Sequence, residues 1–161
     1  MTTDTKYRSV FGGAAIDKVG NVDMITDNIY NVPWIIYTIS GNTYQLFPMK
    51  NLGSHAMNFT DTNDGGYTKS EMYTFVHNTV LPNLKRSGLN ITACDLVSLS
   101  VYNDICSKTG KTSKGIAGGE YFWLTDPYSS DGFYYVFSGG SFNDDYASYS
   151  NGVRPLITVV K

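Results

Sequence analysis

The segment from Tyr128 to Asn151 has the side-chain chemistry of a surface that recognises a ligand by direct contact. It is built almost wholly from Tyr, Ser, Asp, Asn, Gly and Phe, and it contains no Lys, Arg or Glu. Tyrosine offers a large, stiff, amphipathic contact area, whereas Ser, Gly and Asn supply adaptable hydrogen bonds. A hairpin that served only packing would contain more aliphatic residues and more surface Lys or Glu. We therefore interpret the segment as a display surface.

Strand alternation decides which of these side chains face a ligand, because it sends half of any run inward. If Phe133, Tyr135 and Phe137 share one side of a strand, Tyr134 and Val136 occupy the other. The sequence leaves open which side is buried. The residues that we expect to contact the ligand are Tyr128, Phe133, Tyr135, Asn143, Asp144, Asp145, Tyr146, Tyr149 and Asn151.

Residues that perform covalent catalysis form no recognisable motif in this chain. The two histidines, His55 and His77, have no nucleophile motif beside them, and no G-x-S-x-G sequence occurs. Cys94 and Cys106 are too few for a disulfide framework, so we expect two buried or half-buried thiols. A glycosidase needs two opposed carboxylates, and the acidic residues here suggest no specific pair. These features favour a non-catalytic protein.

Metal binding is weakly indicated at two acidic segments. Asp61–Gly66 superficially resembles the start of an EF-hand, but Gly65 stands at the fifth position and Met72 at the twelfth, where oxygen ligands are required. Asn143–Asp145 could hold a cation together with carbonyl groups, although a solvated loop is the preferred interpretation. We therefore expect no metal and no cofactor.

Composition limits the classes of partner. The chain has 161 residues, a formal net charge of -2 and only 16% charged residues. Without a basic stripe to neutralise phosphates, a nucleic-acid partner is not expected. No apolar run has the length of a membrane span, and the polar segment Met1–Val10 lacks the core of a signal peptide. We expect a soluble protein that is made in a cytosol and does not insert into membranes.

The first half of the chain predicts a hairpin followed by a helix. Residues 1–28 are polar and punctuated by glycine, which indicates an irregular N-terminal segment. Trp34–Ile39 and Thr43–Phe47 are β-branched and aromatic runs around a Ser-Gly-Asn turn, as in a β-hairpin. Thr68 to Glu71 fits a capping box, so the main helix should begin near Lys69. Pro82 should end or kink that helix.

The second half predicts a brief helix and then strands. Ser100 could cap a short helix from Val101 to Ile105, followed by an exposed loop over residues 107–119. Later strands are expected at 121–124, 133–137, around 142 and 153–160, with a turn at Gly139-Gly140. Pro155 places the last strand at an edge or bulge, and that strand could pair with the Trp34 strand. Trp123 should be core and Arg154 a structural hydrogen-bond donor.

These elements do not alternate as strand and helix, so a doubly wound parallel sheet is disfavoured. The predicted fold is one α+β domain over residues 1–161, with antiparallel strands, one main helix and one short helix. No internal repeat or linker divides the chain.

Two motifs resemble a family of phage and prophage structural proteins. Gly65–Tyr73, preceded by Met57-Asn58 and Asp61–Asn63, is similar to the family's "MN…TN…GGY-x-x-S-x-M-Y" segment. Phe122–Leu124, then Ala147–Ser150 and Gly152–Pro155, resemble its "YWLR…ASYS-x-GVRP" ending. The resemblance covers roughly residues 30 to 161. The pair of motifs is fairly specific, whereas either motif alone would be weak.

The resemblance implies a C-type-lectin-like domain in a virion protein such as a tail or head fibre, where related domains bind receptors on bacteria. In some relatives, the region between the W-L and G-V-R-P motifs is varied by diversity-generating retroelements. Thr125 departs from the family's Arg, and the tripeptides of calcium-dependent sugar binding are absent. The expected function is therefore adhesion to a bacterial surface glycan or protein, as a variable protein of the virion.

Two other functions remain as alternatives. A structural or decoration module would use the Tyr-rich surface to contact another virion subunit, including its own copy in a homotrimer. An enzyme acting on cell-wall carbohydrate would instead present a concave pocket with converging titratable groups.

Overall fold

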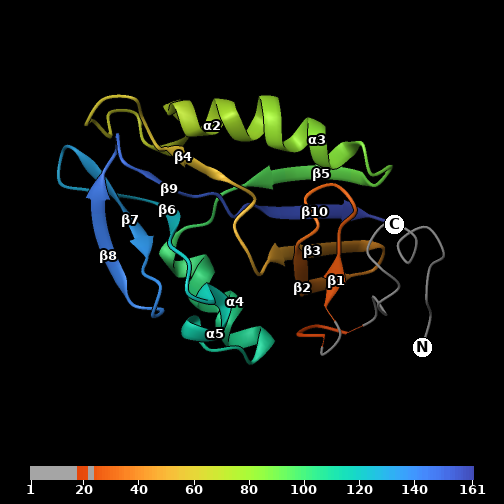
Figure 1. Cartoon of the computed structure of the whole chain (residues 1–161). Coiled ribbons are helices and arrows are strands. Elements are labelled where there is room, and N and C mark those ends of the chain that lie inside the picture. Colours follow the sequence, from red (N-terminus) through yellow and green to blue (C-terminus); the bar gives the residue numbers. More distant parts are fainter. Residues whose placement is uncertain (1–17, 22–23) are drawn as a thin grey trace.

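Two five-stranded sheets lie side by side in the computed structural model, which describes residues 18–21 and 24–161 (Figure 1). Most of the expected irregular segment 1–28 lies outside the described residues. The first sheet is antiparallel, and its strands, in spatial order, are β1 (Ile25–Thr26), β2 (Pro33–Ser40), β3 (Thr43–Pro48), β10 (Leu156–Val160) and β5 (Asn90–Asp95). The strands of the second sheet, in spatial order, are β4 (Ser54–Ala56), β9 (Ser150–Gly152), β6 (Phe122–Tyr128), β7 (Gly132–Val136) and β8 (Phe142–Tyr146).

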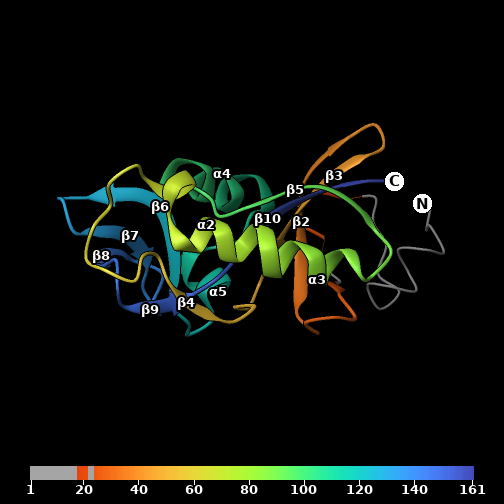
Figure 2. The same ribbon diagram turned by 90° about the horizontal axis from the view of Figure 1, so that it is seen from above.

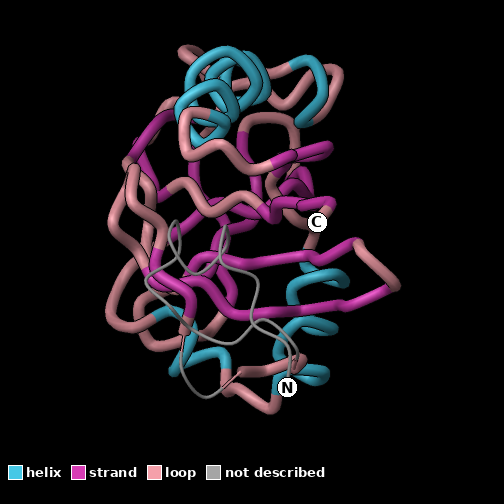
Figure 3. Tube along the Cα trace, turned by 90° about the vertical axis from the view of Figure 1, so that its right-hand side faces the viewer, coloured by secondary structure: helices cyan, strands magenta, loops and turns pink. Residues whose placement is uncertain are grey.

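The α+β class predicted from the sequence is confirmed. The strand pairs are antiparallel except for β6 with β9, which is parallel. Helices lie above and below the strands in the view of Figure 3. Among the described residues, no helix combines the length and apolar character that a membrane span requires.

The α-helical part of the main helix begins at Glu71, two residues later than expected, and the helix continues past Pro82. It consists of η1 (Tyr67–Lys69), α2 (Glu71–Phe75), the π-helical η2 (Val76–Val80) and α3 (Leu81–Lys85), and it runs over both sheets (Figure 2). The cap is Ser70, whose Oγ accepts from the Tyr73 amide at 3.1 Å, so the Thr68 capping box was wrong. Pro82 does not end the helix, because it falls in the first turn of α3, after a π-helical turn.

The region after β5 contains more helix than the sequence indicated. The expected helix 101–105 is α4 (Leu99–Thr109), capped by Ser98 rather than Ser100. The expected loop 107–119 contains the end of α4 and a second helix, α5 (Ser113–Ala117). Ile105, Ile116 and Ala117 are fully buried. Burial of these apolar side chains stabilises the helices, despite the Lys, Thr, Ser and Gly that suggested a loop.

The final strand takes a central place in the first sheet instead of an edge. Ile157 lies opposite Leu46 of β3 on one side and opposite Cys94 of β5 on the other. The predicted pairing with the Trp34 strand was therefore wrong, because β3 separates β2 from β10. Pro155 does not disturb the ladder, since the strand begins only at Leu156. The β2–β3 hairpin and the turn at Gly139-Gly140 are confirmed.

Each tryptophan is completely buried, as predicted for Trp123. Trp34 and Trp123 belong to a core cluster beneath the main helix, which also contains Met72 and Val76. A second cluster surrounds Phe122 and packs the opposite side of the strands against α4 and α5. The second sheet is thus covered by protein over part of both sides, which holds its remaining surface rigid.

The two thiols should differ sharply in reactivity. Burial, followed by the nearby Asp95 carboxylate, raises the pKa of Cys94 from 9.0 to about 12. Cys106 is partly exposed, and burial also raises its pKa. We expect 5,5′-dithiobis(2-nitrobenzoic acid) to label Cys106 in the folded protein and Cys94 only after unfolding, because the thiolate must reach the reagent. The C106S variant should thus resist labelling until denaturant is added, and rapid labelling of that variant would contradict the structure.

The Cys94 pKa also predicts the direction of a pH effect. Its pKa is higher in the folded chain, so the thiol contributes stability that is fully present below pH 9 and is lost between pH 9 and about 12. The C94S variant should lose less stability than wild type over this range in urea titrations.

Candidate functional site

The pairing of β6, β7 and β8 determines which side each display residue occupies. Trp123 lies opposite Tyr135, and Tyr135 lies opposite Asn143. Directly opposed residues share a side of a sheet. Phe133 also lies on this side, but it is fully buried, with its ring centroid 6.4 Å from that of Trp123. The expected ligand contact by Phe133 was therefore wrong, because that side chain belongs to the core.

Three aromatic rings gather on the open part of this side of the sheet. The ring of Tyr121 lies 6.0 Å from Tyr135 in a stacked arrangement and 4.9 Å from Phe137 in an edge-on arrangement. Tyr121 is 41% exposed and Phe137 37%, whereas Tyr135 is only 8% exposed. Tyr135 therefore supports the two outer rings, and they present the contact area.

Polar groups continue the same surface. Asn151 of β9 donates its amide nitrogen to Oδ2 of Asp145 at 3.0 Å, which joins strands β9 and β8 across the sheet. The side chain of Asn143 accepts from the amide of Asp144. We call the surface formed by Tyr121, Tyr135, Phe137, Asn143, Asp145 and Asn151 the cleft face.

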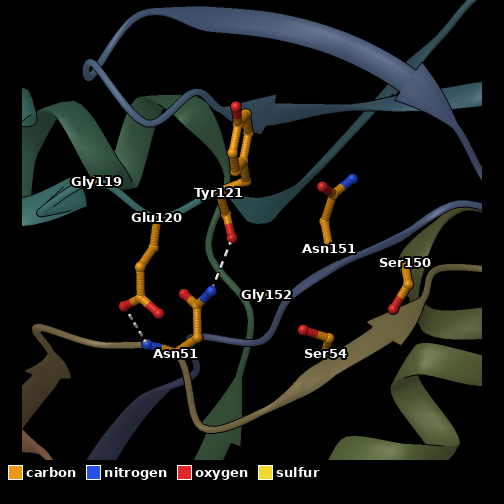
Figure 4. Close-up of a pocket in the computed structure, with 8 residues that line it drawn as sticks. All are labelled: Asn51, Ser54, Gly119, Glu120, Tyr121, Ser150, Asn151 and Gly152. Carbon is orange, nitrogen blue, oxygen red and sulfur yellow. Dashed lines mark hydrogen bonds between the residues drawn. The ribbon is translucent and has the colours of Figure 1, made fainter.

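A cleft of about 270 Å³ opens beside this surface (Figure 4). Tyr121 and Asn151 project in the same direction in Figure 4, with Asn51 and Ser54 below them. This volume lies just below the usual range for small-molecule sites, which begins at about 300 Å³. The residues that line the cleft are Asn51, Ser54, Gly119, Glu120, Tyr121, Ser150, Asn151 and Gly152.

Arg154 is the buried support of the cleft, as its predicted structural role implied. Its guanidinium donates to the carbonyl oxygens of Ile116 and Ala117, to Oδ1 of Asn51 and to Oε1 of Glu120. Burial lowers the pKa of Arg154 from 12.5 to about 10, so the group is still a cation at neutral pH. Oε1 of Glu120 also accepts from the Asn51 amide at 3.1 Å. One buried side chain thus fixes two residues of the cleft.

The opposite side of the second sheet carries most of the exposed tyrosines. Tyr128 and Tyr134 contact each other edge-on, with ring centroids 5.4 Å apart. Asp144 lies opposite Tyr134, and Tyr146 lies opposite Gly132. We call Tyr128, Tyr134, Asp144 and Tyr146 the tyrosine face. A second cleft, of about 280 Å³, lies there and is lined by Tyr128, Ser129, Asp131, Asp144, Asp145 and Tyr146.

Tyr149 extends the tyrosine face from the turn after β8. Its ring lies 5.4 Å from that of Tyr146, and its amide donates to the Tyr146 carbonyl oxygen at 3.0 Å. The two rings are 54% and 48% exposed, respectively. The expected contact residues are therefore divided between two sides of one sheet and do not form a single patch.

The loop before the main helix holds the end of this sheet through hydrogen bonds. The side-chain amide of Asn63 donates to the carbonyl oxygens of Tyr128, Ser129 and Gly132, which form the β6–β7 turn. Asp61 accepts from the Ser148 amide at 3.0 Å, beyond β8. The segment resembling an EF-hand therefore stabilises two other loops through hydrogen bonds.

Other groups that suggested chemistry have structural partners. Nε2 of His77 lies 2.7 Å from Oδ1 of Asp95, which also accepts from the Tyr67 hydroxyl. His55 stacks on Phe75 with centroids 4.3 Å apart. Asn143–Asp145 belongs to strand β8 and not to the solvated loop that we preferred. Within residues 18–21 and 24–161, no His, Cys, Asp or Glu side chains form a group suited to a metal ion.

Several cleft residues were missed from the sequence. Tyr121 and Phe137 are end residues of the predicted strands 121–124 and 133–137, and their alternation with Trp123 and Tyr135 was a usable signal. Asn51, Ser54 and Glu120 come from distant segments, and no local pattern connects them to Asn151.

Comparisons with protein-family models, curated proteins and solved structures find no match for this chain. The geometry of the two faces and the chemistry of their side chains are therefore the basis for a functional proposal. Both faces are parts of one sheet, so a single partner or two different partners could use them.

Proposed function

We propose that this chain is a non-catalytic, receptor-binding domain of a phage virion protein, such as a tail or head fibre. The observation that carries the proposal is the exposure of aromatic and amide side chains on both sides of a sheet whose loops are held by the half-buried Asn63 and the fully buried Arg154. Aromatic side chains of this kind supply most of the contact energy in recognition surfaces. The proposed partner is a bacterial surface glycan or protein.

The anchors matter because a rigid surface loses little conformational entropy on binding. Asn63 holds the β6–β7 turn through three carbonyl contacts, and Arg154 holds the cleft from below. Display residues on such a framework are positioned before the partner arrives. This arrangement supports a binding role more than a packing role.

The same proposal includes a C-type-lectin-like fold and a virion location. Two features support it: the phage-like motifs fall on the structural anchors, and the segment between them carries the exposed residues. Asn63 belongs to the first motif and Arg154 to the second. A retroelement that varied residues 128–151 would mostly change exposed or half-exposed positions and leave these anchors unchanged. Sequencing this segment in related phage isolates would test that part of the proposal.

A structural or decoration module is the second candidate. Strand β8 is an edge of the second sheet, and most of its side chains are exposed, including Phe142 at 40%. An exposed edge strand can pair with another chain. A homotrimer formed through this edge would cover the tyrosine face. Self-association measured by analytical ultracentrifugation would favour this second function.

Cell binding tests the receptor-binding proposal directly. We expect the fluorescently labelled chain to bind some strains in a bacterial panel and the Y146A/Y149A double variant to bind them about tenfold more weakly or worse, because exposed tyrosines act as contact hot spots. Tyr30→Ala, on the first-sheet side of the molecule, is the control and should bind like wild type. Circular dichroism would establish that each variant is folded.

One outcome would contradict the proposal, and another would move its site. Binding to no strain, together with concentration-dependent self-association, would replace receptor binding with the structural role. Equal binding by wild type and Y146A/Y149A would remove the tyrosine face from the site.

A further inference from the structure

We infer that the cleft beside Tyr121 binds one uncharged pyranose ring of a saccharide. This inference rests on the proposed function, and it deepens it by assigning a ligand class and a place. The cleft shares only Asn151 with the residues that the sequence indicated, and it lies on the opposite side of the sheet from Tyr128 and Tyr146.

The apolar part of a sugar needs a flat, rigid surface, and Tyr121 supplies one. The residue is 41% exposed, and its ring is supported from behind by Tyr135 and from the side by Phe137. A ring held in this way does not have to be ordered when a ligand stacks on it, so the entropy cost of binding falls. The C–H face of a pyranose can stack on this ring while the sugar hydroxyls point into the cleft.

The polar part of the cleft is rich in hydrogen-bond acceptors. Glu120 uses Oε1 for its contacts with Asn51 and Arg154, which leaves Oε2 to accept from a ligand. Asn151 uses its amide nitrogen for Asp145, which leaves its carbonyl oxygen. The hydroxyls of Ser54 and Ser150 complete the set (Figure 4). Neighbouring hydroxyl groups of a sugar are donors that match such acceptors.

Charge decides between neutral and acidic sugars. The lining residues include the carboxylate of Glu120 and no Lys or Arg, and the guanidinium of Arg154 is fully buried below. An acidic sugar or a phosphate would meet Glu120 without a compensating cation on the surface. The cleft should therefore reject anions and accept uncharged rings.

The position of Asn51 depends on a glycine. A Cβ atom at Gly152 would lie 2.0 Å from Nδ2 of Asn51 and 2.4 Å from the Tyr121 carbonyl oxygen. Glycine therefore allows Asn51 to approach β9 and donate to that carbonyl at 2.9 Å. Because Arg154 donates to its oxygen, the Asn51 side-chain amide is held at both its nitrogen and its oxygen. Asn51 therefore forms a fixed wall of the cleft.

Nuclear magnetic resonance titration of the full chain tests this inference. The probes are methyl β-D-glucopyranoside, methyl α-D-mannopyranoside and N-acetylglucosamine, with D-glucuronic acid and the open-chain polyol sorbitol as controls. We expect at least one pyranoside to shift the backbone amides of Asn51, Tyr121 and Asn151 in a saturable manner. Glucuronic acid and sorbitol should cause no saturable shift, because one brings a charge and the other lacks a ring.

Tyr121→Ala should weaken binding of the same pyranoside by about tenfold, since a stacking contact of this kind contributes about 1 kcal/mol or more. Phe59→Ala is the control, because Phe59 is an exposed aromatic residue that belongs to neither the cleft face nor the tyrosine face. Asn151→Ala provides a second variant that leaves the aromatic rings unchanged and should also weaken binding.

The inference is overturned if no pyranoside shifts the cleft amides, if sorbitol shifts them equally, or if Phe59→Ala has the larger effect. Its failure is distinguishable from failure of the proposed function. Cell binding that depends on Tyr146 and Tyr149 but survives Tyr121→Ala, without pyranoside binding, would preserve receptor binding and reject the cleft. Pyranoside binding without cell binding would preserve the cleft as a saccharide site and reject receptor binding.

Discussion

Arg154→Met is expected to reduce the free energy of unfolding by about 3–5 kcal/mol. The side chain is fully buried and donates to two carbonyl oxygens at the end of α5 and to two side chains of the cleft. Its guanidinium also lies 4.3 Å from the Phe122 ring centroid. Methionine could fill part of the space but would leave the carbonyl oxygens without donors. Urea denaturation followed by tryptophan fluorescence measures the change.

Two further variants separate the role of Arg154 from a general effect of charge. Arg86→Met removes an exposed arginine after α3 and should change stability by less than about 0.5 kcal/mol. Arg154→Lys keeps the charge but cannot reproduce the fork of donors, so it should still be strongly destabilised. Near wild-type stability of Arg154→Lys would show that the geometry of the contacts matters less than their charge.

Asp27→Ala should cost about 3 kcal/mol through a different mechanism. The buried carboxylate of Asp27 accepts from the amides of Ile29, Tyr30 and Val32 and from Nε1 of Trp34 at 2.9 Å. Alanine would leave these donors without their acceptor in an interior where unpaired groups are costly. The melting temperature should fall by about 10 °C for a chain of this size, as differential scanning calorimetry would measure.

The control for this prediction is Asp64→Ala, which removes an exposed carboxylate from the loop before the main helix. Its melting temperature should stay close to that of wild type. Asp27→Asn retains one acceptor oxygen and should be intermediate. If Asp27→Ala has the same melting temperature as wild type, the turn between β1 and β2 does not depend on this carboxylate.

Local sequence patterns were sufficient to predict the β2–β3 hairpin and the presence of the main helix. The β2–β3 hairpin follows from two β-branched runs around a Ser-Gly-Asn turn, and the start of the main helix follows from polar caps before apolar spacing. Helix α5 was missed because Ser113–Ala117 has weak helical propensity. Its stability depends on burial of Ile116 and on the contact of Arg154 with its last carbonyl oxygens, neither of which sequence spacing reveals.

The candidate site was predictable in composition but not in geometry. The Tyr-rich segment carries several exposed aromatic side chains, and its role as a ligand surface stays a prediction. Phe133 faces inward, and the remaining residues divide between two sides of the sheet. That division follows from the register of β7 with β8, which one sequence does not specify. The cleft joins residues near 51, 120 and 151, so only the fold brings them together.

Strand β8 gives the molecule a capacity for evolutionary change. Its register with β7 is set by main-chain hydrogen bonds, and its side chains at Asn143, Asp144 and Tyr146 project mainly into solvent. Replacing such residues usually alters stability by no more than about 0.5 kcal/mol. The position that must keep its residue type is Gly132 in the neighbouring strand β7. A Cβ atom there would come within 2.3 Å of the Asp145 carbonyl oxygen. Natural selection can therefore replace the outward residues of this strand many times while the chain keeps folding to the same structure.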